Sequence, residues 1–114
     1  MRISRKPRSL SINGFQIRLR RTTGGVAEVW ADDELALAAG QGYMHAHDRL
    51  SQMMLWRLVG QGRSCECLKN GAEQLQMDIH FRNLGLAYYA RQEWEQCTPQ
   101  AREFAEAYCQ GINH

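Results

Sequence analysis

Apolar and polar side chains alternate near the start of the chain, and residues 9–31 are predicted to be extended. The alternation is clearest where Phe15, Ile17 and Leu19 are separated by single polar residues, the period-two pattern of a strand with one buried face. The Asn-Gly pair at residues 13–14 is the dipeptide most typical of a tight hairpin turn. A second turn is predicted at Thr22–Gly25 and a further strand at Val26–Ala31.

Beyond residue 33 the apolar positions change to helical spacing, and a long helix is predicted from Glu34 to about Val59. Its apolar and small side chains fall within a narrow arc that contains Leu35, Ala39, Gly42, Ala46, Leu50 and Met53. Three of these are Ala or Gly, so this face lets another element approach closely. Asp32 and Asp33 are expected to cap the helix, because their carboxylates accept hydrogen bonds from the free amides of a first turn.

Two further helices are predicted in the second half of the chain. The second runs from about Asp78 to Trp94, with Phe81, Leu84, Gly85 and Tyr88 on one face. The third begins after Thr98, a natural N-cap, with Pro99 at the first helical position. Its apolar face contains Phe104, Ala105, Tyr108 and Ile112. Short N-terminal strands followed by three helices give an α+β class. Three short strands cover three amphipathic helices poorly, so we expect the core to need further sequence.

Composition and charge exclude several classes of partner. The 114 residues carry a formal net charge of +2, and the clustered basic face typical of nucleic-acid binding is missing. We expect residues 1–8 to form a basic, disordered terminus and residues 9–114 to form the domain. Neither a signal peptide nor a membrane span is visible in the sequence. The compartment is unknown, and cytoplasmic is the default expectation.

The segment His45-Ala46-His47-Asp48 raises the question of a metal or acid/base site. A binuclear hydrolase loop needs one residue between the second His and the Asp, and a His directly after that Asp, whereas Arg49 follows Asp48 here. On a helix His45 and His47 lie about 200° apart and cannot share one ion. Asp48 is expected to pair with Arg49 or another Arg, which favours its charged form and makes it a poor proton shuttle at neutral pH. His45 is placed either for contact with Asp48 or Arg49 or for exposure to solvent.

The remaining reactive side chains form no recognisable site. The cysteines at positions 65, 67, 97 and 109 do not have zinc-ligand spacing and are expected to be free thiols. No Ser lies in a Gly-x-Ser-x-Gly elbow. The sequence therefore assigns no catalytic, cofactor-binding or metal residue.

The segment Gly42–Met53 nevertheless resembles a motif of the penicillin acylase family, whose members are N-terminal nucleophile (Ntn) amidohydrolases. The motif is Gly-Tyr-x-x-Ala-Gln-Asp-Arg-Leu-x-Gln-Met, near the start of the α subunit. The matching residues are Gly42, Tyr43, Ala46, Asp48, Arg49, Leu50, Gln52 and Met53. Later matches, in the family's order, are Gly62, Glu66, Asp78, Arg82, Leu84, Gly85, Tyr108, Gly111 and Asn113. The departures are Val26–Val29 in place of Val-Pro-His-Ile, Thr22-Thr23 after Arg21, His47 in place of Gln, and Cys65 in place of a small residue.

The resemblance implies that residues 9–114 are the N-terminal segment of an α subunit and a fragment of the αββα Ntn sandwich. The family's nucleophile is the N-terminal Ser of a β chain, which attacks the amide carbonyl with its own amine as base. The implied substrates are small N-acyl amides, with β-lactam side chains or acyl-homoserine lactones as the two classes. Many members bind calcium at the α/β junction, and some relatives are periplasmic.

The same resemblance assigns this segment a scaffolding role. The 114 residues contain no Gly-Ser or Gly-Cys junction for self-cleavage, so the nucleophile is expected on the β chain and the segment is expected to be inert alone. Asp48, Arg49, Asp78 and Arg82 are expected to be buried or bridging charges that hold helices in place. One alternative is a small non-enzymatic helical protein that binds a partner through its small-residue face. Another is a zinc or iron protein built on His45, His47 and the cysteines.

Overall fold

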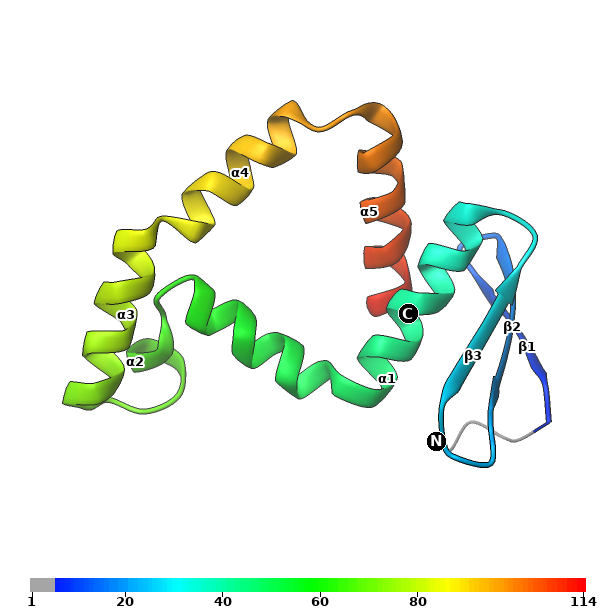
Figure 1. Ribbon diagram of the computed structural model, residues 1–114, viewed down its shortest axis with the longest axis horizontal. Helices are drawn as coiled ribbons and strands as arrows, with labels where there is room; N and C mark the ends of the chain where they lie inside the picture. The colour runs from blue at the N-terminus through cyan, green and yellow to red at the C-terminus, as the bar shows by residue number, and fades with distance from the viewer. Residues whose placement is uncertain (1–5) are drawn as a thin grey trace. The chain divides into compact units, whose positions relative to one another are not determined.

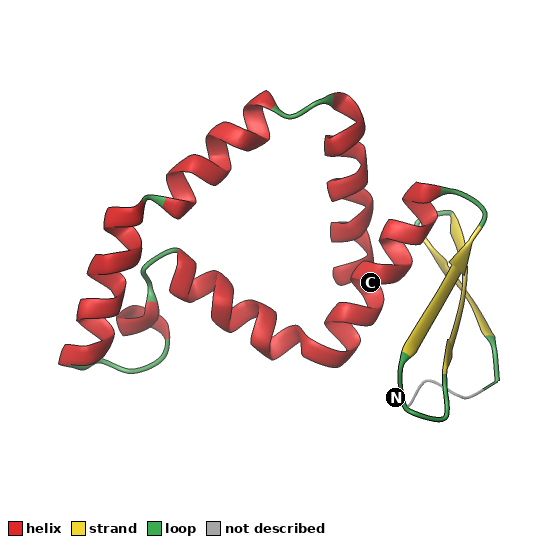
Figure 2. Ribbon diagram, viewed as in Figure 1, coloured by secondary structure: helices red, strands yellow, loops and turns green. Residues whose placement is uncertain are grey.

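The computed structural model describes residues 6–114, and within this range three strands precede five helices (Figures 1 and 2). The elements are β1 (Arg8–Ile12), β2 (Phe15–Arg21), β3 (Ala27–Ala31), α1 (Glu34–Gly60), α2 (Ser64–Cys67), α3 (Ala72–Leu84), α4 (Leu86–Gln96) and α5 (Pro99–Ile112). This order confirms the α+β class. Of the expected basic terminus, residues 1–5 lie outside the described residues, and Arg8 is already the first residue of β1. No helix in residues 6–114 has the length and apolar character needed to cross a membrane.

The chain divides into two compact units. Unit 1 comprises the residues up to Asp48 together with Thr98–His114, and unit 2 comprises Arg49–Cys97. Helix α1 contributes to both units. At Arg49 its backbone is not helical, with φ −139° and ψ 20°.

The sheet of unit 1 is antiparallel, in the order β1-β2-β3. Asn13 and Gly14 connect β1 to β2 with φ values of 46° and 94°. Positive φ at both central residues is what a two-residue hairpin of the favoured twist requires. The turn sets the pairing of Ile12 with Phe15. The predicted hairpin is therefore confirmed.

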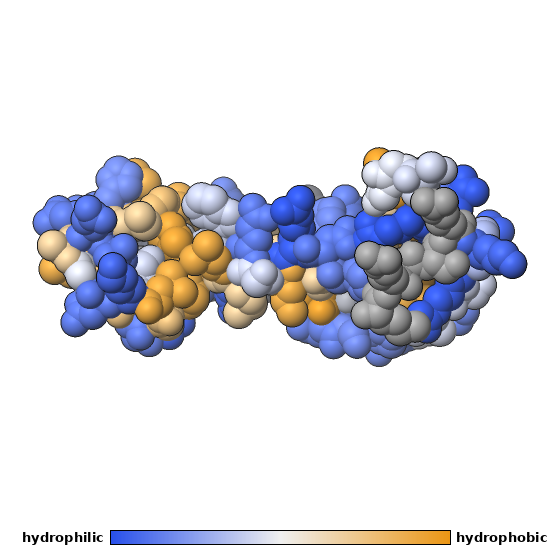
Figure 3. Space-filling view, turned by 90° about the horizontal axis from the view of Figure 1, so that it is seen from below, coloured by the Kyte–Doolittle hydropathy of each residue, from blue (hydrophilic) through white to orange (hydrophobic). Residues whose placement is uncertain are grey.

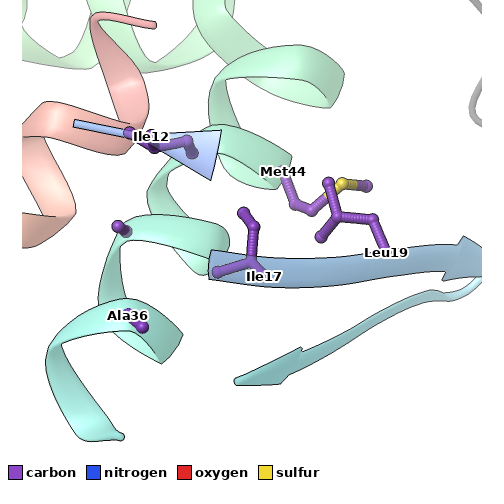
Figure 4. Packing of buried hydrophobic residues seen from close by; sticks show 6 residues of the cluster. Ile12, Ile17, Leu19, Ala36 and Met44 are labelled. Atoms are coloured by element: carbon purple, nitrogen blue, oxygen red, sulfur yellow. The ribbon is translucent and has the colours of Figure 1, made fainter. Parts of the chain in front are cut away.

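The hydrophobic core of unit 1 lies between this sheet and the first half of α1 (Figure 4). Its buried members are Ile12, Ile17, Leu19, Ala36, Ala39 and Met44. Gly40 faces the sheet, where an added Cβ would lie 2.5 Å from Cγ1 of Val29. The alternating strand residues thus bury one face, as the sequence pattern predicts.

Helices α1 and α5 meet through their backbones. A Cβ added to Gly42 would lie 2.0 Å from the carbonyl oxygen of Tyr108, and one added to Gly111 would lie 1.9 Å from that of Ala39. The prediction that the small-residue face admits a close neighbour is confirmed. On α5 the buried residues are Ala107 and Gly111. The predicted apolar face was wrong in part, since Phe104 is 44% exposed.

Two of the three predicted helix starts have the expected caps. Asp33 Oδ1 accepts a hydrogen bond from the amide of Ala36 at 2.8 Å, at the start of α1. Thr98 Oγ1 accepts one from the amide of Ala101 at 3.2 Å, and Pro99 is the first residue of α5. These short-range signals place both helix starts correctly because cap and helix are adjacent in sequence.

The single helix predicted from Asp78 to Trp94 was wrong. Helix α3 begins earlier, at Ala72, and ends at Leu84, because Gly85 adopts the left-handed conformation with φ 70°. Helix α4 starts again at Leu86. The short helix α2 was not predicted. Left-handed glycine is a frequent helix end, but the apolar periodicity continues across Gly85 and hid the break.

Candidate functional site

The carboxylate of Asp78 holds the start of α2 in unit 2. Asp78 is 5% exposed. Its two oxygens accept hydrogen bonds from the backbone amides of Ser64 and Cys65, each at 2.8 Å. Burial alone would raise the pKa of this carboxyl, but the amide hydrogen bonds from Cys65 and Ser64 outweigh it and hold the pKa below its usual range. Asp78 is therefore a buried bridging charge, as the resemblance implies.

Arg82, one turn after Asp78 on α3, binds the same loop from the other side. Its Nε donates a hydrogen bond to the carbonyl oxygen of Gly62 at 2.8 Å. Gly62 has φ 62°, and a Cβ there would lie 2.5 Å from Cγ of Arg82. Two charged residues at i and i+4 thus fix the backbone between α1 and α2. Their contacts are structural, since both side chains form hydrogen bonds with backbone atoms of this chain.

Glu66 and Arg63 form an exposed ion pair next to that loop. Arg63 donates from Nε at 3.0 Å and from Nη2 at 2.7 Å to the two carboxylate oxygens of Glu66. The hydrogen bonds from Arg63 and its positive charge hold the pKa of Glu66 below its usual range. This two-pronged geometry orients both side chains.

Asp48 joins α1 to the end of β2 in unit 1. Its Oδ1 accepts hydrogen bonds from Nη2 of Arg21 and, at 3.0 Å, from Nδ1 of His47. Arg21 also donates from Nη1 to the carbonyl oxygen of Gly25 at 2.8 Å. Partial burial raises the pKa of Asp48, but the hydrogen bonds from His47 and Arg21 outweigh it and lower the pKa. The expected Asp–Arg pair is confirmed, with Arg21 as the partner.

The expectation that Arg49 is a buried or bridging charge was wrong. Arg49 is exposed and forms no ion pair among the residues that the structure describes. His45 does not contact Asp48, because its Nδ1 lies 2.9 Å from the hydroxyl of Tyr108 on α5. The two histidines therefore have different partners. Arg21 and Tyr108 are partners that sequence reasoning missed, and no local pattern marks either of them.

The cysteines and carboxylates do not gather around a common point. All four cysteines are free thiols, and Cys65 donates weakly from Sγ to the carbonyl oxygen of Gly71 at 3.8 Å. Within residues 6–114, no three His, Cys, Asp or Glu side chains are placed to hold one metal ion. The candidate site is therefore a set of two separate scaffolding clusters, one around Asp48 and one around Asp78.

Known proteins resemble this chain over nearly its whole length. Residues 16–114 match the family model described as penicillin amidase. Penicillin acylase 2 proenzyme of Pseudomonas sp. (strain SE83) is 36% identical over 107 residues, covering 92% of this chain and 14% of that protein. Acyl-homoserine lactone acylase QuiP of Pseudomonas aeruginosa is 40% identical over 72 residues, covering 63% of this chain and 8% of that protein.

A solved structure agrees in fold as well as in sequence. Thermostable penicillin G acylase from Alcaligenes faecalis matches with a TM-score of 0.74 and 25% identity, over 85% of this chain and 51% of that chain. This chain thus spans only a small part of the length of its curated relatives. The family model covers more than three quarters of the sequence, including both scaffolding clusters. The chain belongs to the penicillin amidase family.

Proposed function

We propose that this chain is the N-terminal segment of the α subunit of an amidohydrolase that cleaves the amide bond of small N-acyl compounds. The relatives are named as acylases of penicillins and of acyl-homoserine lactones, and both names describe removal of an acyl group from an amine. The β-lactam side chain and the acyl-homoserine lactone are therefore the two substrate classes to test. The full activity requires polypeptide beyond the 14% of the proenzyme's length that this chain matches.

In this proposal the segment positions other parts of the enzyme and does not react. The observation that supports this role is that the charged side chains of the family motifs bind other groups of this chain. Asp78 and Arg82 bind backbone amides and a carbonyl of this chain, and Asp48 binds Arg21. A carboxylate held ionised by such donors is a poor proton shuttle at neutral pH. The attacking Ser of a β chain, with its α-amine as base, supplies the reaction step in this proposal.

Calcium, which the family resemblance implies for the full enzyme, is proposed to bind outside this segment. Calcium takes six to eight oxygen ligands, several of them carboxylates. The carboxylates of Asp48, Asp78 and Glu66 accept hydrogen bonds from Arg, His or amide donors of this chain. We therefore assign no residue of this segment to calcium.

Comparing two preparations tests the proposal. The first is residues 1–114 alone, and the second is the complete encoded polypeptide that contains them. Both are assayed with a chromogenic N-acyl anilide and with an N-acyl-homoserine lactone. We expect hydrolysis only by the complete polypeptide. Hydrolysis by residues 1–114 would disprove the inactivity of the segment. A complete polypeptide that is folded but hydrolyses neither substrate would contradict the enzymatic role.

A further inference from the structure

Unit 2 contains a groove of about 730 Å³ between the second half of α1 and helix α4. The residues that give it its chemistry are Trp56 and Arg57 from α1 and Ala87, Ala90, Arg91 and Trp94 from α4. The lining thus combines small side chains of α4 with two indoles and two guanidinium groups. None of these residues belongs to the clusters around Asp48 and Asp78.

The groove carries positive charge that the chain itself does not neutralise. The guanidinium groups of Arg57 and Arg91 form no ion pair or hydrogen bond with any residue from 6 to 114. A third lining residue, Arg63, is already paired with Glu66. The lining contains one acidic residue, Glu95, and the structure shows no ion pair between Glu95 and either Arg57 or Arg91. Charge complementarity therefore favours an anionic occupant.

The unit that contains the groove also exposes many apolar side chains. Trp56 is 60% exposed and Trp94 is 40% exposed. Within residues 6–114, most of the large hydrophobic side chains that are exposed belong to unit 2, among them Leu50, Met54, Leu55, Leu86, Tyr88 and Tyr89. Figure 3 shows apolar residues gathered on the surface of unit 2, on the left of the view. Exposed apolar side chains in this number favour a polypeptide segment over a small solute as the occupant.

We propose that this groove binds an acidic segment of the longer polypeptide to which the chain belongs. The segment carries an Asp or Glu next to a large apolar side chain. Its carboxylate pairs with Arg57 or Arg91, which suit two-pronged carboxylate recognition, and its apolar side chain packs against Trp56 and Trp94. This inference rests on the proposed function, in which the chain is one segment of a longer acylase. The basis for the longer polypeptide is that this chain matches only 14% of the length of one proenzyme relative.

Photo-crosslinking in the complete encoded polypeptide tests the inference. Two separate variants carry the crosslinker p-benzoylphenylalanine, one in place of Trp56 and one in place of Trp94. Mass spectrometry then identifies the crosslinked peptide. We expect both positions to reach one segment of the same polypeptide outside residues 1–114, with Asp or Glu beside an apolar residue. Crosslinks to a neutral or basic segment, to a different protein, or to nothing would overturn the inference.

Charge reversal tests the role of the two arginines. Combining Arg57→Glu with Arg91→Glu is expected to lower the crosslink yield about tenfold, the equivalent of about 1.4 kcal/mol. Lys at both positions keeps the charge and is expected to retain most of the yield. The control Arg18→Glu changes an exposed arginine of β2 and is expected to leave the yield unchanged. Changing the acidic partner to Lys in the double-Glu variant should restore crosslinking. An unchanged yield after charge reversal would refute the electrostatic contact.

The same preparations separate this inference from the proposed function. Each is assayed for hydrolysis of the N-acyl substrates. Hydrolysis without crosslinking from the groove would reject the groove inference and leave the enzymatic role intact. Crosslinking to an acidic segment without hydrolysis would support the groove inference and reject the enzymatic role.

Discussion

Asp78 and Asp48 both have a lowered pKa, but different hydrogen-bond donors lower it in the two residues. Asp78 is held by two backbone amides, which do not titrate and whose positions are set by the fold. Asp48 is held by side chains of Arg21 and His47 on a partly exposed surface. Two aspartates that both match motifs of the family therefore have different structural roles. Asp78 fixes a loop inside unit 2, and Asp48 ties a strand to a helix in unit 1.

Removing the charge of Asp78 is expected to destabilise the complete polypeptide and to change its acid sensitivity. Because the folded-state pKa is lowered, ionised Asp78 stabilises the fold above the unfolded pKa of about 4, and this contribution is lost as pH falls through the folded pKa. Asp78→Asn loses one amide hydrogen bond and the titration together. Urea unfolding between pH 2.5 and about 7 should show lower stability at neutral pH and a shallower decline in acid.

Glu73→Gln is the matched control for that experiment. Glu73 lies in the first turn of the same helix and is exposed. Its loss should leave stability within about 0.5 kcal/mol of the original. An equal effect of the two substitutions would mean that the amide contacts of Asp78 do not stabilise the loop.

The Arg21–Asp48 pair is expected to stabilise the fold only slightly. The side chains of Arg21 and Asp48 are 21% and 33% exposed, so solvent screens their attraction. A double-mutant cycle with Arg21→Gln and Asp48→Asn should give a coupling free energy of about 0.5–1 kcal/mol. Denaturant unfolding of the four proteins measures it. Coupling that is absent at low salt would contradict the pairing, and the coupling should decrease in 1 M salt.

At the scale of elements, backbone contact between α1 and α5 is the most demanding feature of unit 1. Gly42 and Gly111 leave no room for a Cβ, since the facing atoms are carbonyl oxygens of Tyr108 and Ala39. Backbone atoms cannot rotate away as a side-chain end can. The identity of these two residues is therefore set by packing between helices, and the helix propensity that glycine costs is offset by that packing.

Alanine at either position is expected to destabilise the fold strongly. Gly42→Ala would place a Cβ 2.0 Å from a carbonyl oxygen and Gly111→Ala one 1.9 Å from a carbonyl oxygen, well inside van der Waals contact. We therefore expect each change to lower the free energy of unfolding by about 3 kcal/mol or more. Thermal unfolding of the complete polypeptide measures the loss.

The control is Gly60→Ala at the last residue of α1, where an added Cβ meets nothing within 4 Å. This change should be neutral or stabilise the helix by up to about 1 kcal/mol. Similar losses at positions 42 and 60 would indicate a general effect of alanine and would contradict the close helix contact.

At the scale of the whole molecule, burial is divided unequally between the two units. Unit 1 has a cluster of buried apolar residues under its sheet. In unit 2 the buried apolar residue is Val59, and large side chains such as Trp56 and Tyr88 are more than half exposed. A unit that leaves this much apolar surface in water gains little from hydrophobic burial. The proposed acidic segment would supply the missing partner surface.

Residues 1–114 expressed alone are therefore expected to behave as a partly folded protein. The exposed apolar surface should bind the dye ANS, and calorimetry should show a broad transition without full cooperativity. In the complete polypeptide, dye binding should fall. A monomer of residues 1–114 with a sharp transition and no dye binding would contradict this expectation and favour the alternative of a free-standing partner-binding protein.

Short-range features of this protein were set by the sequence alone. Each of these features depends on residues that are adjacent along the chain or one helical turn apart, and was therefore predictable. They are the Asn13-Gly14 hairpin, the Asp33 and Thr98 caps, and the small-residue face containing Gly42. The motif around Asp48 also indicates the family without any knowledge of tertiary contacts.

Only the tertiary structure decided which partners these residues take. Arg21 and Asp48 are 27 positions apart, and His45 and Tyr108 are 63 apart. Neither pair leaves a trace in hydrophobic periodicity, which records the face of a residue and not the identity of its neighbour. The break at Gly85 was equally hidden, because a glycine is tolerated inside a helical pattern and its left-handed φ is visible only in the folded backbone. The sequence determined the local conformations and the family, and the fold determined the roles of the charges, because those depend on long-range contacts.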